Sequence, residues 1–180
     1  MDSLGLESDA RRVFDVGCGN GSLIRALASR GWKGIGIDPS KSGVEEANKA
    51  GIGEFYVASA YDDLAGRFGT FPAVVSLEVV EHVYDPRLYA RNVFNLLSPG
   101  GLAVISTPYH GYLKNLALAV MGKFDRHHGP LWDHGHIKFW SIGTLTELLK
   151  ETGFEVLRFH RVGRIPALAK SMIAVARKPK

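Results

Sequence analysis

The sequence contains a single cysteine and no apolar segment long enough to cross a membrane. One cysteine cannot form a disulfide within the chain, which fits a reducing compartment. The most apolar stretches, residues 71–80 and 116–121, are much shorter than the ~20 residues of a membrane-spanning helix. The first thirty residues carry acids and glycines where a signal peptide has an apolar core. These absences predict a cytoplasmic protein that contacts a membrane at most peripherally.

Internal repeats and low-complexity linkers are also absent. The chain has 180 residues, of which 46% are hydrophobic and 22% charged. This average globular mixture excludes collagen, coiled coils and wholesale disorder. The length is that of one ordinary domain, and we expect a single domain over residues 1–180.

Acidic residues are missing from the end of the chain, where seven basic residues and no acid follow Glu155. Residues 109–180 contain 12 Lys and Arg against 5 acids, whereas residues 1–108 contain 10 against 13. Such an excess of positive charge could contact phosphate or an anionic membrane. A solvated basic face is the commoner explanation, and we favour it.

Short runs rich in Val, Ile and Phe alternate with amphipathic segments of helix length. The predicted strands are residues 12–16, 34–37, 55–58, 73–77, 102–106, 154–159 and 172–176. The predicted helices include residues 22–29, 112–121 and 144–151, the last capped by Gly153. Another carries Val44, Ala47 and Ala50, with Ser40 or Ser42 as its cap, and one begins at the Asp85-Pro86 cap and continues through Leu97. This alternation indicates an α/β fold built around a mostly parallel sheet.

Residues 109–140 form a long insertion that we expect to act as a lid or substrate wall. Its helix-like part can place six apolar residues on one stripe: Tyr112, Leu113, Leu116, Ala117, Val120 and Met121. With Lys114 and Lys123 at its edges, the stripe suits a hydrophobic substrate tail or an anionic bilayer surface. Packing on the protein's own core is the commoner role of such a stripe, and we favour it.

A strand, three alternating glycines and a helix follow one another in the pattern Gly17-x-Gly19-x-Gly21. Glycines let the main chain turn tightly and approach a ligand at the start of a helix. The dinucleotide fingerprint would require its third glycine at Ser22, which opposes a nicotinamide dehydrogenase. Asp15, inside the strand, suits a cationic group, and Asp38, at the end of the next strand, can accept both hydroxyls of a ribose.

The chain resembles the class I S-adenosylmethionine-dependent methyltransferases in several motifs that occur in order. These are Phe14-Asp-Val-Gly-Cys-Gly-Asn-Gly21, Gly34-Ile-Gly-Ile-Asp38, Leu97-Ser-Pro-Gly-Gly101 and Ile105-Ser-Thr-Pro108. The resemblance implies a Rossmann-like, seven-stranded sheet with an antiparallel last strand and helices on both faces. It also implies an enzyme that transfers a methyl group from S-adenosylmethionine.

Cofactor-binding residues follow from this resemblance, and they cluster at the ends of the first four strands. They are Asp15, Gly17, Cys18, Gly19, Gly21, Asp38, Pro39, Ala60, Tyr61 and Leu77. Many relatives have an acid after the third strand that meets the adenine amino group. This sequence reads Ser59-Ala-Tyr-Asp62 there, so the adenine contact stays open among Ala60, Tyr61 and Asp62.

A second cluster, Glu78-Val-Val-Glu81-His82, follows the fourth strand. If the chain is helical there, Glu78, Glu81 and His82 share one face, where they could bind a divalent cation or supply a general base. The phrase is similar to one in ubiquinone-biosynthesis O-methyltransferases and small-RNA 3′-end 2′-O-methyltransferases, where it contributes metal ligands. The alternative is that Glu78 and His82 only wall the cofactor pocket and that Glu81 pairs with a neighbour.

Four of the seven histidines lie within residues 127–136. The segment around His136 is similar to a His-containing segment of both families, and His136 is our first choice to complete a site with Glu78, Glu81 and His82. We interpret His127 and His128 as ordinary loop residues. Structural zinc is disfavoured because Cys18 is the only thiol.

We expect Tyr109, His110, Trp132 and Trp140 to build an acceptor pocket above these groups, since aromatic faces suit a ring or a sugar. The favoured function is O-methylation of a small-molecule, sugar or lipid-linked acceptor. An RNA 2′-O-methyltransferase is less favoured because no interleaved aromatic and basic motif is visible. A non-catalytic cofactor-binding module is a further alternative, because only about a dozen residues precede the first strand.

Overall fold

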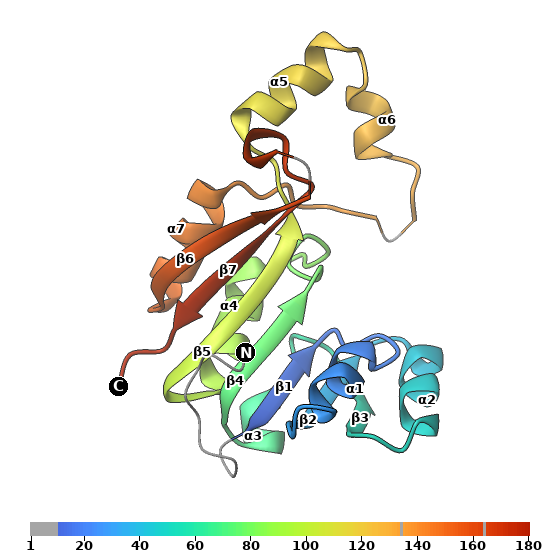
Figure 1. The fold of residues 1–180 in the computed structure, drawn as a ribbon, viewed down its shortest axis with the longest axis vertical. Helices are drawn as coiled ribbons and strands as arrows, with labels where there is room; N and C mark the ends of the chain where they lie inside the picture. The colour runs from blue at the N-terminus through green and yellow to red at the C-terminus, as the bar shows by residue number, and fades with distance from the viewer. Residues whose placement is uncertain (1–10, 134, 164) are drawn as a thin grey trace.

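The computed structural model describes residues 11–133, 135–163 and 165–180. Its strands form one sheet in the order β3-β2-β1-β4-β5-β7-β6, in which β7 runs antiparallel to both neighbours (Figure 1). The strands are β1 (Arg12–Val16), β2 (Lys33–Asp38), β3 (Glu54–Val57), β4 (Phe71–Leu77), β5 (Leu97–Pro108), β6 (Glu155–Val162) and β7 (Ser171–Arg177). The predicted Rossmann-like sheet with an antiparallel last strand is confirmed.

Helices cover both faces of the sheet, as predicted. They are α1 (Ser22–Ala28), α2 (Lys41–Lys49), α3 (Leu64–Phe68), α4 (Pro86–Asn95), α5 (Tyr112–Val120), α6 (Phe124–His128), α7 (Ile142–Thr152) and the 3-10 turn η3 (Pro166–Leu168). α1 and α2 pack on β1, β2 and β3, while α4 and α7 pack together on β5 and β6. The helices α3, α6 and η3 were not predicted, because they are too short to show an apolar period.

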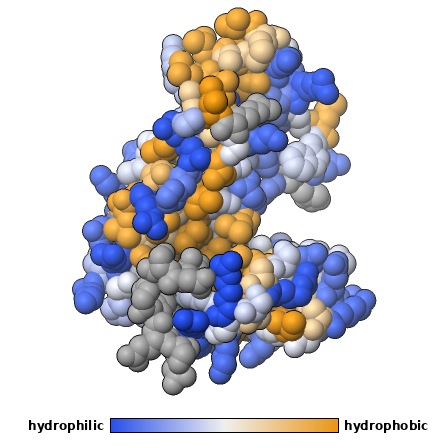
Figure 2. All heavy atoms as spheres, viewed as in Figure 1, coloured by the Kyte–Doolittle hydropathy of each residue, from blue (hydrophilic) through white to orange (hydrophobic). Residues whose placement is uncertain are grey.

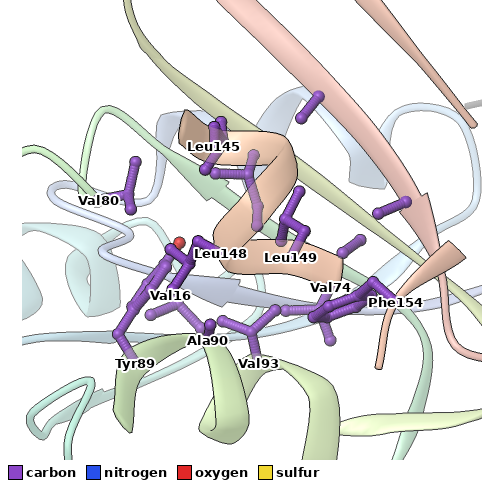
Figure 3. Close-up of a cluster of buried hydrophobic side chains, with 14 of the residues drawn as sticks. Val16, Val74, Val80, Tyr89, Ala90, Val93, Leu145, Leu148, Leu149 and Phe154 are labelled. Atoms are coloured by element: carbon purple, nitrogen blue, oxygen red, sulfur yellow. The ribbon is translucent and has the colours of Figure 1, made fainter. Parts of the chain in front are cut away.

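The core follows from the alternation of side chains along the strands. In β1, Val13 points toward α1 and joins Leu27 and Trp32, whereas Phe14 and Val16 point to the opposite face. Figure 3 shows that opposite face, where leucines of α7 interdigitate with Val93 of α4 and with strand valines. Burial of each such side chain stabilises the fold by about 1.5–3 kcal/mol. The sheet is therefore a rigid platform for the loops at its edge.

Polar caps fix where several helices begin. Asp85 accepts a hydrogen bond from the Leu88 N–H (3.0 Å), and Pro86 occupies the first turn of α4. Ser141 and Thr144 form a capping box at the start of α7. The predicted start of α4 and the glycine cap of α7 at Gly153 are both present. The chain therefore leaves the sheet edge at defined residues.

The carboxyl ends of the parallel strands lie at one edge of the sheet, where the loops after β1 to β5 meet. Strand order reverses between β1 and β4, so chain direction diverges at that point. In open α/β sheets, ligands bind at such a switch point. The predicted glycine loop and Glu78-to-His82 segment leave the sheet from these two strands.

The insertion after β5 projects beyond this edge as α5 and α6 (Figure 1). α5 packs on α6 and η3 rather than on the sheet. Tyr112 and Val120 are 79% and 80% exposed, and Leu113, Leu116 and Met121 are also exposed. Figure 2 shows apolar residues gathered at this end of the molecule. The expectation that the stripe packs on the protein's own core is therefore wrong for these five residues.

Lys114, placed at the edge of the stripe, is instead buried, and its ammonium donates to the Tyr109 carbonyl (2.7 Å). None of the helices among the described residues has the length and apolar content needed to cross a bilayer.

Candidate functional site

The loop after β1 is held tightly against β2 and leaves one glycine open. The N–H groups of Gly17 and Cys18 both donate to the Ile37 carbonyl (2.8 and 2.9 Å). Gly17 has a φ of +83°, and a Cβ there would collide with Val79. Gly19 also has a positive φ, +52°, but no described atom lies within 4 Å of the place of its Cβ. A ligand can therefore approach the main chain at Gly19.

Asp38 connects this loop to the end of β2. One carboxylate oxygen accepts from the Gly19 N–H (2.9 Å), and the other accepts from the Ser40 N–H (2.8 Å). Each oxygen keeps a further lone pair for another donor. The carboxylate thus fixes the loop and can still accept hydrogen bonds from ligand hydroxyls, as the sequence predicts.

Asp15 is a buried acid beneath the same loop. Its side chain is 1% exposed, and its Oδ2 has no hydrogen-bond partner in the described part of the chain. Burial, followed by the charge of Asp38, raises the pKa of Asp15 to about 7. A cation bound above the loop would favour the ionised form, so the site suits a positively charged group.

The Cys18 side chain lies away from this site, among the apolar residues Ile24, Val44 and Phe55. Burial, with the charges of Asp15 and Asp38, raises the pKa of the Cys18 thiol to about 12. Cys18 can therefore contact a cofactor only through its main chain.

The loop after β3 contains the three alternatives for an adenine contact. The Asp62 carboxylate accepts from the Ser59 N–H (2.9 Å), so it is engaged by its own turn. The Tyr61 hydroxyl accepts from the N–H groups of Tyr84 and Asp85 (2.6 and 3.1 Å). Asp62 keeps its second carboxylate oxygen and Tyr61 its hydroxyl proton, so the adenine contact stays open among the three residues. Pro39 and Leu77 are exposed at the same edge of the sheet.

The segment after β4 is a turn. The expectation that Glu78, Glu81 and His82 share one face of a helix is therefore wrong. Glu78 has a φ of +55°, unlike every other non-glycine residue in the described ranges. The Ser106 hydroxyl donates to Glu78 Oε1 (2.7 Å) and accepts from the Glu78 N–H (3.1 Å). This pairing ties Glu78 Oε1 to β5. Glu78 is not among the side chains whose ligand atoms come together, but its charge still acts on Glu81 and His136.

Glu81, His82 and His136 do come together, with ligand atoms within 4.8 Å of one another. His136 Nε2 lies 4.0 Å from Glu81 Oε1, and the rings of His82 and His136 are 4.8 Å apart. Main-chain bonds hold the two segments together, since the N–H groups of Ile137 and Lys138 both donate to the Glu81 carbonyl (2.9 and 3.0 Å). The predicted approach of His136 to Glu81 is therefore a feature of the structure.

The Glu81 carboxylate is buried and lacks a well-placed partner. It is 1% exposed, and neither oxygen makes a hydrogen bond of good geometry to a described residue. Burial raises the pKa of Glu81 to about 7, and the charge of Glu78 adds to this effect, while the nearby Thr107 hydroxyl lowers it. Burial and the charge of His82 lower the pKa of His136. An acid and a neutral imidazole so placed can exchange a proton or bind a cation.

A cavity of about 610 Å³ opens beside His136, beneath α5 and α6. His110 and Trp132 line it, as expected, but Tyr109 and Trp140 are not among its lining residues. Both are less than a tenth exposed, and the Trp140 indole donates to the Val80 carbonyl (3.0 Å). Two of the four predicted pocket aromatics are therefore structural.

The cavity also has walls that the sequence analysis missed. His127 and His128, interpreted as ordinary loop residues, belong to α6 and line the cavity beside His110, with ring centroids 5.5 and 5.8 Å away. Lys114, Lys123, Arg126 and Lys170 contribute positive charge. No sequence spacing reveals this set, because α6 folds back over the end of β5.

Three features lie together at the carboxyl edge of this sheet: a glycine loop, a carboxylate at the end of the second strand, and an adjoining cavity. Together with the strand order, they define a Rossmann-like methyltransferase fold. The chain belongs to the methyltransferase domain family, whose sequence profile matches residues 3–158.

Curated relatives agree with this family. The ubiquinone biosynthesis O-methyltransferase of Azorhizobium caulinodans is 32% identical over 150 residues, which cover 81% of this chain and 59% of that protein. The protein of the same name from Chromobacterium violaceum is 32% identical, with 87% and 69% covered. The aligned part is thus about three fifths of the length of the first of these relatives.

Solved structures share the fold. A methyltransferase from Methanosarcina mazei gives a TM-score of 0.72 at 22% identity, with 97% of this chain and 94% of that chain covered. Magnesium protoporphyrin IX methyltransferase from Synechocystis, solved with bound SAH, gives a TM-score of 0.71 at 22% identity, with 92% and 73% covered. S-Adenosylmethionine is the methyl donor that the family implies.

Proposed function

We propose that this protein is an S-adenosylmethionine-dependent O-methyltransferase that acts on a small or lipid-linked acceptor. The observation that carries the proposal is the position of Glu81 and His136. Their side chains lie 4.0 Å apart, and His136 lines the large cavity. The cofactor loop leaves the sheet from the neighbouring strand β1, which pairs with β4. A donor site and a proton-accepting pair therefore adjoin one another, which argues against a cofactor-binding module without catalysis.

The expected reaction is an in-line displacement at the methyl carbon. The acceptor oxygen forms a bond to that carbon while the carbon–sulfur bond breaks. The electron pair of the broken bond stays on sulfur. Alignment of the two reactants can contribute about 7–11 kcal/mol. His136, whose pKa is lowered by burial, can take the hydroxyl proton, and Glu81 then stabilises the imidazolium. Asp15 faces the positive charge of the donor.

The residues present also fit a divalent cation. The buried Glu81 carboxylate lacks a well-placed partner, and two imidazoles lie beside it. One carboxylate and two imidazoles suit Zn²⁺ or Mn²⁺ better than Mg²⁺. Glu81, His82 and His136 would hold the ion, which would lower the pKa of an acceptor hydroxyl when bound.

The exposed apolar face of α5 supports a lipid-linked acceptor or peripheral contact with a membrane. Leu113, Leu116 and Val120 present apolar surface, and Lys123 and Arg126 follow immediately. Apolar surface flanked by basic residues favours an anionic bilayer. RNA is the less favoured acceptor, because a cavity of about 610 Å³ has the size of a small-molecule site.

Calorimetric titration with S-adenosylhomocysteine tests the donor site. The wild type should bind it and should not bind NADH. Asp38→Ala should weaken binding by about 1.5–3 kcal/mol, because charge-assisted hydrogen bonds and the loop geometry are both lost. Asp63→Ala is the matched control, since Asp63 caps α3 instead. Binding of NADH in place of S-adenosylhomocysteine would refute the proposed function.

A further inference from the structure

The cavity beneath α5 and α6 is strongly basic. Four of its lining residues are basic, namely Lys114, Lys123, Arg126 and Lys170. Four histidines line it as well, and none of the described lining residues is acidic. A concave site lined by one sign of charge concentrates ligands of the opposite sign.

The acids among the described residues do not neutralise three of these four cations. Within the described ranges, Lys123, Arg126 and Lys170 form no ion pair. The Lys114 ammonium is fixed at the wall by its bond to the Tyr109 carbonyl, and the side chain is only 8% exposed. An anionic ligand in the cavity could pair with Lys123, Arg126 and Lys170.

His110 gives a second, independent indication. Its side chain is 7% exposed and lines the cavity. Its Nδ1 atom makes no well-placed hydrogen bond in the part of the chain that the structure describes, although the Asn115 side chain lies nearby. Burial, then the positive charges of Lys114 and His127, lowers the pKa of His110 to about 4. The neutral ring can donate one N–H to an oxyanion without adding charge.

We propose that the methyl acceptor carries an oxyanion, either a carboxylate or a phosphate, which the basic walls of this cavity bind while the acceptor hydroxyl lies at His136. This inference rests on the proposed function and adds the substrate class. Apolar walls, among them Leu118, Met121 and Phe139, separate the charged groups. They suit an aromatic or short aliphatic part between the hydroxyl and the oxyanion. The acceptor is thus an anionic, amphipathic hydroxyl compound.

Calorimetric titration in the presence of saturating S-adenosylhomocysteine tests this inference. The probes are 4-hydroxyphenylacetate, its neutral counterpart 4-hydroxyphenylacetamide, and phenyl phosphate, which separates a preference for phosphate from one for carboxylate. At least one anion should bind about tenfold more tightly than the neutral amide, and added salt should weaken its binding. Tight binding of phenyl phosphate alone would define a phosphate site, and the reverse would define a carboxylate site.

Paired variants separate a local site from overall charge. Lys123→Gln with Arg126→Gln should weaken binding of the anion about tenfold and leave binding of the amide unchanged. Lys150→Gln with Arg158→Gln removes the same charge from exposed positions that do not line the cavity, and it should have little effect. The four residues changed in these two double variants are all exposed, so both variant proteins should fold.

Three results would overturn the inference: equal affinity for anion and amide, equal weakening by the two double variants, or failure of both anions to bind. Failure of the proposed function looks different. In that case S-adenosylhomocysteine itself does not bind, whereas here it binds and only the anion preference is missing.

Discussion

Gly17 and Gly19 lie two residues apart in the loop after β1, but their surroundings differ. A Cβ at Gly17 would meet Val79, whereas the space beside Gly19 is open. Gly17→Ala should therefore lower the free energy of unfolding by about 2–4 kcal/mol, from clash and backbone strain together. Gly19→Ala should cost only about 1–2 kcal/mol of strain, yet its methyl group would occupy the ligand's place and weaken S-adenosylhomocysteine binding. Urea unfolding and calorimetry measure both effects, and equal stability losses would contradict this division.

Asp15 should make the stability of the ligand-free protein depend on pH. In the folded chain its pKa is about 7, but an unfolded aspartate loses its proton near pH 4. The folded state therefore binds more protons between these values, and stability falls as pH rises through that window. Asp15→Asn removes the effect. Relative to wild type, the variant should gain on the order of 2–3 kcal/mol between pH 5 and pH 8 in urea unfolding, while losing affinity for the cofactor. A constant difference across this range would argue against the buried charge.

The three-residue cluster predicts which side chains bind a cation. After treatment with a chelator, Mn²⁺ should bind the wild type in a calorimetric titration, and His136→Ala should weaken binding by about 10- to 100-fold. Glu78→Gln tests the fourth predicted ligand, because glutamine can accept the same bond from Ser106 but lacks the charge that acts on Glu81 and His136. Asp63→Ala is the control, since Asp63 caps α3. A loss of affinity in Glu78→Gln would restore the four-ligand arrangement. No binding by the wild type would leave Glu81 and His136 as a metal-free pair.

At the scale of elements, α5 presents an apolar face without a described partner. The protein should sediment with anionic liposomes, and less so at high salt. Leu113→Ser with Leu116→Ser should weaken this association about tenfold, because two apolar side chains no longer enter the interface. Ile52→Ser with Val57→Ser changes two equally exposed apolar residues elsewhere and should have no effect. Equal sedimentation of both double variants would exclude α5 as the contact.

Element prediction succeeded where a local signal exists. The strand at Arg12–Val16, the capped helix after Asp85 and the helix ending at Gly153 all carry their own boundaries in composition and caps. The helix assumed for residues 78–82 is wrong for a physical reason, since the positive φ of Glu78 and its bond to Ser106 depend on β5, 28 residues away. His136 meets Glu81 through main-chain bonds that no spacing encodes, and its prediction rested on family resemblance.

The parts of the molecule differ in how firmly they are held. β4 and β5 lie at the centre of the sheet and pack on a buried core, whereas α5 and α6 contact mainly one another and η3. Amides of residues 112–128 should exchange by local opening at low denaturant, and those of β4 and β5 only by global unfolding. Hydrogen exchange with mass spectrometry measures this. Equal protection of the two regions would show that the insertion unfolds with the core.

Main-chain bonds close the base of the insertion, from the His110 N–H to the Trp140 carbonyl (2.9 Å) and from Ile137 and Lys138 to Glu81. Side-chain bonds from Trp140 to Val80 and from Lys114 to Tyr109 add to them. Main-chain bonds of this kind do not depend on the identity of the side chains between them. The amino acids of residues 111–134 can thus change in evolution, or be exchanged in the laboratory, while these main-chain bonds stay in place. The protein could then accept new methyl acceptors without a change in the donor site. The bonds from Ile137 and Lys138 to Glu81 would still place His136 beside Glu81.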